Sequence, residues 1–96
     1  MRAASGVTLG GTAVFNCAGQ VLACLTFNVS SSAPSSTQSA LVTGLPRPSV
    51  ETYAVACNAA GQNQRVYLDV NGALRLDGSR VGTGWFTCNF PYVAAS

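Results

Sequence analysis

Three acidic residues, Glu51, Asp69 and Asp77, are the only carboxylate side chains in this 96-residue chain. A pair of carboxylates is the usual apparatus for hydrolysing a glycosidic bond. Here each has a structural explanation: Asp69 sits at a turn, Asp77 falls opposite Arg65 in a hairpin, and Glu51 follows a proline-rich loop. We therefore expect no glycosidase pair.

The remaining residue types also argue against catalysis. The chain contains no histidine, so neither a serine nor a cysteine has an imidazole to activate it. Its four cysteines, Cys17, Cys24, Cys57 and Cys88, lack the close C-x-x-C pairs of a zinc site. We expect a non-enzymatic protein without a metal ion or other cofactor.

The cysteines are expected to be reduced. Cys17 falls in a turn and Cys24 lies several strand residues beyond it, on the order of 10 Å or more away and outside disulfide reach. The N-terminal sequence has no apolar run long enough for a signal peptide. A disulfide between Cys57 and Cys88 is the one pairing left open. Cys24 and Cys88 are expected as small core residues beside Leu22, Phe86 and Phe90.

The composition argues against two classes of binding partner, nucleic acids and membranes. Five arginines and no lysine give a net charge of +2, and the arginines are scattered along the chain, which argues against a nucleic-acid surface. No segment is apolar over the length of a membrane span, so we expect no membrane insertion. The length indicates one domain over residues 1–96, with residues 1–6 as a flexible lead.

Residues 64–77 form the hairpin that organises the rest. Asp69-Val70-Asn71-Gly72 has an acceptor side chain first and a glycine fourth, which predicts a three-residue loop with a bulge. Asp69 then faces Ala73. The register places Leu68 opposite Leu74 and Val66 opposite Leu76 on one face, and Tyr67 opposite Arg75 and Arg65 opposite Asp77 on the other.

Two more segments share the Asx-x-x-Gly pattern. Asn58-Ala59-Ala60-Gly61 predicts that Asn58 pairs with Gln62, which makes residues 51–77 a three-stranded meander. Asn16-Cys17-Ala18-Gly19 predicts a first hairpin, in which Phe15 faces Val21 and Ala13 faces Ala23 on one apolar face. Its second strand, residues 20–29, alternates regularly between apolar and more polar positions.

About seven short strands follow from this reading, at residues 7–16, 20–29, 40–45, 51–57, 64–69, 73–77 and 85–93. Residues 30–39 are a surface loop because they lack apolar periodicity. Pro91 predicts an edge or bulge near the end of the last strand. The fold class is therefore all-β, an antiparallel β-sandwich or jelly-roll-like domain.

The two predicted turns of the meander also bring polar residues together on its outer face. Tyr53 falls beside Tyr67 and Tyr67 beside Arg75, while the next row contains Arg65 and Asp77. Aromatic rings could cover the apolar face of a sugar while Arg and Asp bind its hydroxyls. A solvated outer face or a subunit interface explains the same residues, because Tyr and Arg are enriched at interfaces and cross-strand pairs stabilise sheets.

The order of these elements resembles the C-terminal head or tip domain of bacteriophage tail fibres and receptor-binding proteins. The resemblance covers Val7 to Val93: a hairpin with a glycine turn, a Ser/Thr loop, a Gly-Leu-Pro-x-Pro segment, an Asx-x-x-Gly-x-Leu hairpin and a Gly-Thr-Gly-Trp entry to the last strand. The residues that carry it are Gly44, Leu45, Pro46, Pro48, Asp69, Gly72, Leu74, Gly82, Thr83, Gly84, Trp85 and Tyr92.

The resemblance implies a homotrimer at the end of a fibre, made in the host cytoplasm and carried in the virion, which binds a polysaccharide of the bacterial surface without catalysis. Four cysteines are unusual for such tips. An alternative is a structural virion protein, such as a capsid decoration or fibre-capping protein, whose partners are other virion proteins. A secreted, disulfide-bonded lectin is a third reading.

Overall fold

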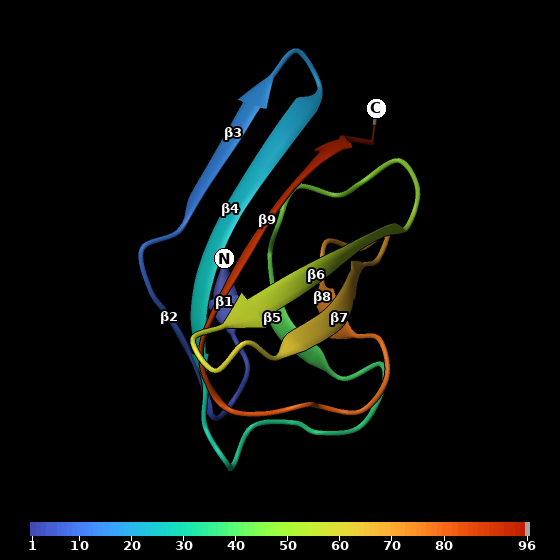
Figure 1. The fold of residues 1–96 in the computed structure, drawn as a ribbon. Coiled ribbons are helices and arrows are strands. Elements are labelled where there is room, and N and C mark those ends of the chain that lie inside the picture. Colours follow the sequence, from blue (N-terminus) through green and yellow to red (C-terminus); the bar gives the residue numbers. More distant parts are fainter. Residues whose placement is uncertain (96) are drawn as a thin grey trace.

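The computed structural model describes residues 1–95, and these contain strands but no helix (Figure 1). The all-β class is confirmed. Residues 1–95 form nine strands where about seven were expected, because residues 7–16 form two strands and an additional strand lies at the N-terminus. They are β1 (Arg2–Ala3), β2 (Val7–Leu9), β3 (Ala13–Cys17), β4 (Gln20–Val29), β5 (Ala40–Thr43), β6 (Thr52–Asn58), β7 (Asn63–Leu68), β8 (Leu74–Leu76) and β9 (Gly84–Val93).

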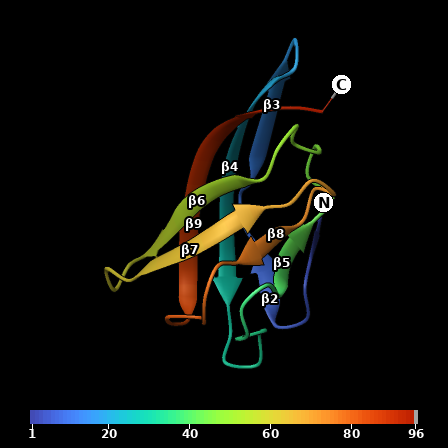
Figure 2. The ribbon, with the colours of Figure 1, turned by 90° about the vertical axis from the view of Figure 1, so that its right-hand side faces the viewer.

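All strand pairs are antiparallel and belong to one sheet, in the order β1-β5-β8-β7-β6-β9-β4-β2, with β3 paired to β4. The two ends of this order, β1 and β2, are joined by a short turn in which the Val7 amide donates to the Ala4 carbonyl at 2.9 Å. The sheet therefore nearly closes into a barrel. Figures 1 and 2 show β4 and β9 running side by side, with the shorter β6 and β7 crossing them at an angle.

The core lies inside this nearly closed sheet. Alternate residues of β4 and β9 point inward, and Phe27 and Phe86 stack there with ring centroids 5.9 Å apart. The meander supplies leucines from the other side. Side chains in such interiors are packed as densely as in organic crystals, so these positions tolerate little change in volume. The fully buried apolar residues include Leu25, Phe27, Leu41, Val42, Val66, Leu68, Leu74, Leu76, Phe86 and Cys88.

The predicted register of the β7–β8 hairpin is confirmed. Leu68 pairs with Leu74 and Tyr67 with Arg75, while the Asp69 amide donates to the Ala73 carbonyl at 3.0 Å. The turn between β6 and β7 is confirmed as well, since the Asn58 amide donates to the Gln62 carbonyl at 3.2 Å. Strands β6, β7 and β8 thus form the expected meander.

The predicted register of the first hairpin is wrong by one residue. Phe15 pairs with Leu22 and Ala13 with Cys24, because the loop contains two residues, Ala18 and Gly19, with φ angles of 52° and 84°. Two consecutive residues with positive φ form the turn whose twist matches that of the flanking strands. The shift places Phe15 beside Leu22 on the outward face of β4, so the expected apolar face of Phe15 with Val21 does not form.

The first strand lies at the N-terminus. Arg2 and Ala3 pair with Thr43 and Val42, because β5 offers them an otherwise unpaired edge. The flexibility expected for residues 1–6 stays a prediction. Strand β6 pairs with β9 only through Cys57 and Asn58, opposite Thr87 and Phe86. At Pro91, this edge of β9 therefore has no β6 residue beside it, which agrees with the edge position that the proline predicted.

The Gly-Leu-Pro-x-Pro segment packs against the end of β9. The Tyr92 hydroxyl donates to the Pro46 carbonyl at 2.8 Å, and the Ser49 amide donates to the Val93 carbonyl at 2.9 Å. On its other side, the Leu45 amide donates to the Gly72 carbonyl at 3.1 Å. This segment therefore connects the β7–β8 turn with the C-terminal strand.

Replacing Gly72 by alanine should destabilise the fold more than replacing Gly61. Both glycines have positive φ, 87° and 79°, which costs an alanine about 1–2 kcal/mol. A Cβ at Gly72 would also collide with the Leu45 backbone carbonyl, whereas a Cβ at Gly61 meets nothing within 4 Å. Denaturant titration should show that Gly72→Ala loses about 1–3 kcal/mol more unfolding free energy than Gly61→Ala. Equal losses in the two variants would contradict the close approach of Leu45.

Candidate functional site

The outer face of the meander brings together the residues that the sequence singled out. Tyr53 pairs with Tyr67, and their ring centroids lie 5.6 Å apart with a 32° angle between the rings. Tyr67 pairs in turn with Arg75 on β8. In the next row, Arg65 Nη2 lies 3.2 Å from Asp77 Oδ2. The predicted adjacency is therefore present, while its use in binding stays a prediction.

Tyr53 is the more exposed of the two tyrosines on this face. It is 60% exposed, and its hydroxyl donates to Glu51 Oε1 at 3.3 Å. The negative charge of Glu51 raises the pKa of Tyr53 above its usual value, so the phenol stays protonated and able to donate. Tyr67 is half-buried beside it. The pair presents an aromatic surface with a hydrogen-bonding group at its rim.

Arg65 is largely solvated, and its partner Asp77 is half-buried. The Arg65 side chain is 74% exposed, and ion pairs of this kind contribute little to stability. Their donors and acceptors can therefore exchange the mutual contact for a polar ligand without a large energetic penalty. This property suits a shallow site that binds hydroxyl groups.

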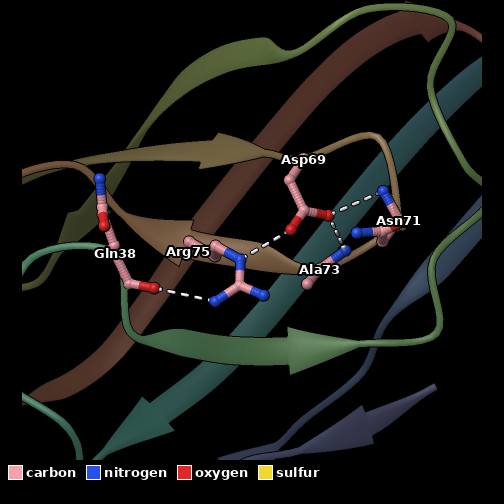
Figure 3. Close-up of polar contacts among 5 residues, drawn as sticks. All are labelled: Gln38, Asp69, Asn71, Ala73 and Arg75. Carbon is pink, nitrogen blue, oxygen red and sulfur yellow. Dashed lines mark hydrogen bonds and ion pairs between the residues drawn. The ribbon is translucent and has the colours of Figure 1, made fainter.

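Arg75 is held differently (Figure 3). Its Nε lies 2.7 Å from Asp69 Oδ2, and its Nη1 donates to the Gln38 carbonyl at 2.9 Å. The guanidinium thus bridges the β7–β8 hairpin and the loop before β5. The sequence placed Arg75 among the ligand-binding candidates, but these contacts engage it within the fold. The use of Arg75 in ligand binding stays a prediction.

The Asp69 carboxylate accepts more hydrogen bonds than the predicted turn requires. Its Oδ1 accepts hydrogen bonds from the amides of Asn71 at 2.9 Å and Ala73 at 3.0 Å, in addition to the contact of Oδ2 with Arg75. Burial of the carboxylate would raise its pKa. The hydrogen bond from Arg75 and those from the two amides outweigh burial, so the pKa of Asp69 lies below its usual value.

The four cysteines are free thiols. Cys57 is exposed and its thiol donates to Asn63 Oδ1 at 3.1 Å, whereas Cys88 is fully buried. The prediction of Cys88 as a core residue is confirmed. The prediction of Cys24 as a core residue beside Leu22 is wrong: Cys24 is half-buried and Leu22 is 43% exposed, because both lie on the outward face of β4.

Sequence reasoning missed one surface. An open groove of about 560 Å³ lies along the β3–β4 hairpin and the end of β9. A two-residue reading of the first turn would have placed Phe15 and Leu22 on the outside and so indicated this surface. Its lining consists of Phe15, Cys17, Gln20, Val21, Leu22, Pro91, Tyr92 and Val93.

Within residues 1–95, the structure contains no group of three or more His, Cys, Asp or Glu side chains that could hold a metal ion. The described part of the chain also has no helix that is long and apolar enough to cross a membrane. Comparisons of the chain with protein-family models, curated proteins and solved structures found no match.

Replacing Asp69 by asparagine should destabilise the protein at neutral pH. Asparagine retains an oxygen for the two turn amides but loses the ionic contact with Arg75, a loss of about 1–3 kcal/mol. Asp77→Asn is the matched control, because it removes an exposed pair worth about 1 kcal/mol or less. Equal free energies of unfolding for Asp69→Asn and the wild-type protein would contradict this role.

The effect of Asp69→Asn should also depend on pH. The folded pKa is lower than the ordinary value of 3.8, so ionised Asp69 stabilises the fold above pH 3.8. That contribution is lost as the pH falls through the folded pKa. Urea titrations from pH 7 to pH 2 should therefore show that the free energies of unfolding of Asp69→Asn and the wild-type protein converge below pH 3.8. A difference in free energy of unfolding that stays constant over this range would contradict the prediction.

Cys57 and Cys88 should differ in reactivity with an alkylating reagent. Burial, with a smaller contribution from Cys57, raises the pKa of Cys88 to about 12, and the side chain has no solvent access. Peptide mass spectrometry should find Cys57 modified in the native protein and Cys88 modified only after unfolding. Modification of both at similar rates would show that Cys88 is not in the core.

Proposed function

We propose that this protein is a non-enzymatic receptor-binding module at the tip of a bacteriophage tail fibre, and that it recognises a glycan of the bacterial cell surface. The observation that carries the proposal is the Tyr53–Tyr67 pair, in which Tyr53 is exposed, bordered by charged and hydrogen-bonding groups on the outer face of the meander.

Sugars have apolar ring faces edged by hydroxyl groups, and the meander face offers the matching chemistry. The Tyr53 ring can lie against an apolar sugar face. Glu51 at its hydroxyl, and Arg65 with Asp77 in the adjacent row, supply acceptors and donors for hydroxyl groups.

The order of sequence elements supports the proposed setting. Its resemblance to tail-fibre tips leads us to propose a homotrimer located in the virion. In this assembly, Arg75 keeps the face in shape through Asp69 and Gln38 while the tyrosines make the direct contact. Tyr53, Tyr67, Arg65 and Asp77 are therefore the ligand-contacting residues of the proposal.

A second candidate function follows from a different observation. Strands β3, β4 and β9 contain no charged residue, and several large apolar side chains of these strands are exposed. A structural virion protein, such as a decoration or capping protein, would use such a surface to bind other virion proteins. Mass spectrometry of purified virions distinguishes the two: copy numbers that follow capsid symmetry favour the structural role, and copy numbers of a tail fibre favour the receptor-binding role.

Binding to the bacterial strains that the phage infects should depend on the two tyrosines. Tyr53→Ala and Tyr67→Ala are each expected to weaken binding to cells or to a surface-glycan array by about tenfold, equivalent to about 1.4 kcal/mol. Tyr53→Phe keeps the aromatic ring and should lose less binding affinity than Tyr53→Ala. Val70→Ala alters an exposed apolar residue at the β7–β8 turn and should bind normally. Full binding by both alanine variants, or no binding by the assembled wild-type protein, would refute the proposal.

A further inference from the structure

One asparagine of this chain is followed directly by a glycine. The sequence has six asparagines, and only Asn71, in the β7–β8 turn, has this neighbour, Gly72. Asparagine is a thermolabile residue, because its side chain can react with the backbone amide nitrogen of the next residue. A glycine in that place has no Cβ to hinder the approach. Asn71 is also exposed, so water can reach its side chain. It is therefore the asparagine of this chain most prone to this reaction.

Cyclisation at this pair forms one bond and breaks another. The Gly72 amide nitrogen gives up its proton to water or hydroxide and bonds to Asn71 Cγ, and the side-chain nitrogen leaves as ammonia. Water then adds to one of the two carbonyl carbons of the resulting five-membered imide and opens the ring. The product at position 71 is an aspartate, or an isoaspartate in which the backbone continues through the former side chain. Water is the only co-reactant, and nothing is oxidised or reduced.

The folded turn holds both peptide units of this pair. The Gly72 amide donates to the Asp69 carbonyl at 3.0 Å, so the attacking nitrogen is engaged within the turn. The Asn71 amide donates to Asp69 Oδ1 at 2.9 Å (Figure 3). In addition, the Gly72 carbonyl accepts from the Leu45 amide at 3.1 Å, and a Cβ on Gly72 would collide with the Leu45 carbonyl. To reach Asn71 Cγ, the Gly72 nitrogen must turn away from the Asp69 carbonyl, which breaks these contacts.

We propose that Asn71 is a site of spontaneous deamidation in this protein, and that the Asp69 turn controls its rate. Reaction at Asn71 requires local opening of the β7–β8 turn. When opening and closing are fast relative to the chemical step, the rate follows the population of the open turn. Asp69 stabilises the closed turn through the amides of Asn71 and Ala73 and through Arg75, so loss of these contacts exposes the pair to reaction.

Both products disturb the closed turn. An isoaspartate lengthens the backbone inside the short loop between Asp69 and Ala73, which displaces Gly72 from its partners Asp69 and Leu45. An aspartate adds a negative charge close to the Asp69 carboxylate, and like charges repel. Loss of ammonia is irreversible under these conditions, so the reaction limits the lifetime of the fold. This inference goes beyond the proposed function and does not depend on any ligand.

The first test measures deamidation of the full chain in neutral buffer by peptide mass spectrometry, which detects the exchange of an amide for an acid at position 71. Wild-type protein unfolded in urea should react at least about tenfold faster than the folded protein, because the turn is then open. Asp69→Asn loses the ionic contact with Arg75. The expected destabilisation of about 1–3 kcal/mol corresponds to a rate about 5- to 150-fold above that of the folded wild-type protein.

Asp77→Asn is the matched control, and it also creates a second Asn-Gly pair, at positions 77 and 78. Gly78 is exposed, its amide donates to Thr37 Oγ1 at 3.0 Å, and a Cβ on it would meet nothing within 4 Å. In the folded variant, position 77 should deamidate at least about tenfold faster than position 71, whereas in urea the two rates should agree within about threefold. The rate at position 71 should stay within about fivefold of the wild-type rate, because the exposed Asp77 pair contributes about 1 kcal/mol or less.

Equal rates at position 71 in folded and urea-unfolded wild-type protein would overturn the inference. Equal rates at positions 71 and 77 in folded Asp77→Asn would overturn it as well. A rate for Asp69→Asn equal to that of the wild-type protein would show that Asp69 does not control the opening. Far-ultraviolet circular dichroism establishes whether each variant is folded. If Asp69→Asn is unfolded, the two positions of Asp77→Asn still decide, because that variant retains the Asp69 turn.

Discussion

The Asp69 carboxylate holds the register on which the rest of the structure depends. Its oxygens accept hydrogen bonds from two turn amides and from Arg75, so the β7–β8 hairpin closes with one alignment. That alignment sends Leu68 and Leu74 into the core and Tyr67 outward. Through Arg75 it also fixes the Gln38 carbonyl, which ties the loop before β5 to the hairpin. A one-residue slip of β7 against β8 would place Leu68 and Leu74 on opposite faces of the hairpin.

Charge is distributed so that the two sides of the sheet have different properties. The meander carries ion pairs and a tyrosine pair on its outside, which suits contact with a polar, hydroxyl-rich ligand. The β3, β4 and β9 strands carry apolar and uncharged polar side chains, which suit contact with an uncharged protein surface. The glycan that we propose as the ligand is therefore expected at the meander face.

Sequence reasoning succeeded where charge distinguished one register from another. For the β7–β8 hairpin, the wrong loop length would have placed Leu68 opposite Arg75, so the pattern selected the right one. The β3–β4 hairpin offered no such contrast, because apolar residues fall on both of its faces. Its loop length depends on the positive φ of Ala18, which a rule based on Asn16 and Gly19 does not include. The groove was missed for the same reason. The Asp69–Arg75 contact was also missed, because the register sets Arg75 beside Tyr67 but does not fix the direction of its guanidinium.

Nuclear Overhauser contacts across residues 64–77 in solution test the central claim most directly. The account predicts close contacts between the backbones of Leu68 and Leu74 and between those of Tyr67 and Arg75, with the Asp69 amide protected from solvent exchange by the Ala73 carbonyl. Contacts that pair Leu68 with Arg75 instead would contradict it, because Leu68 would then share a face with the guanidinium, and Tyr67 would share a face with the leucines of β8.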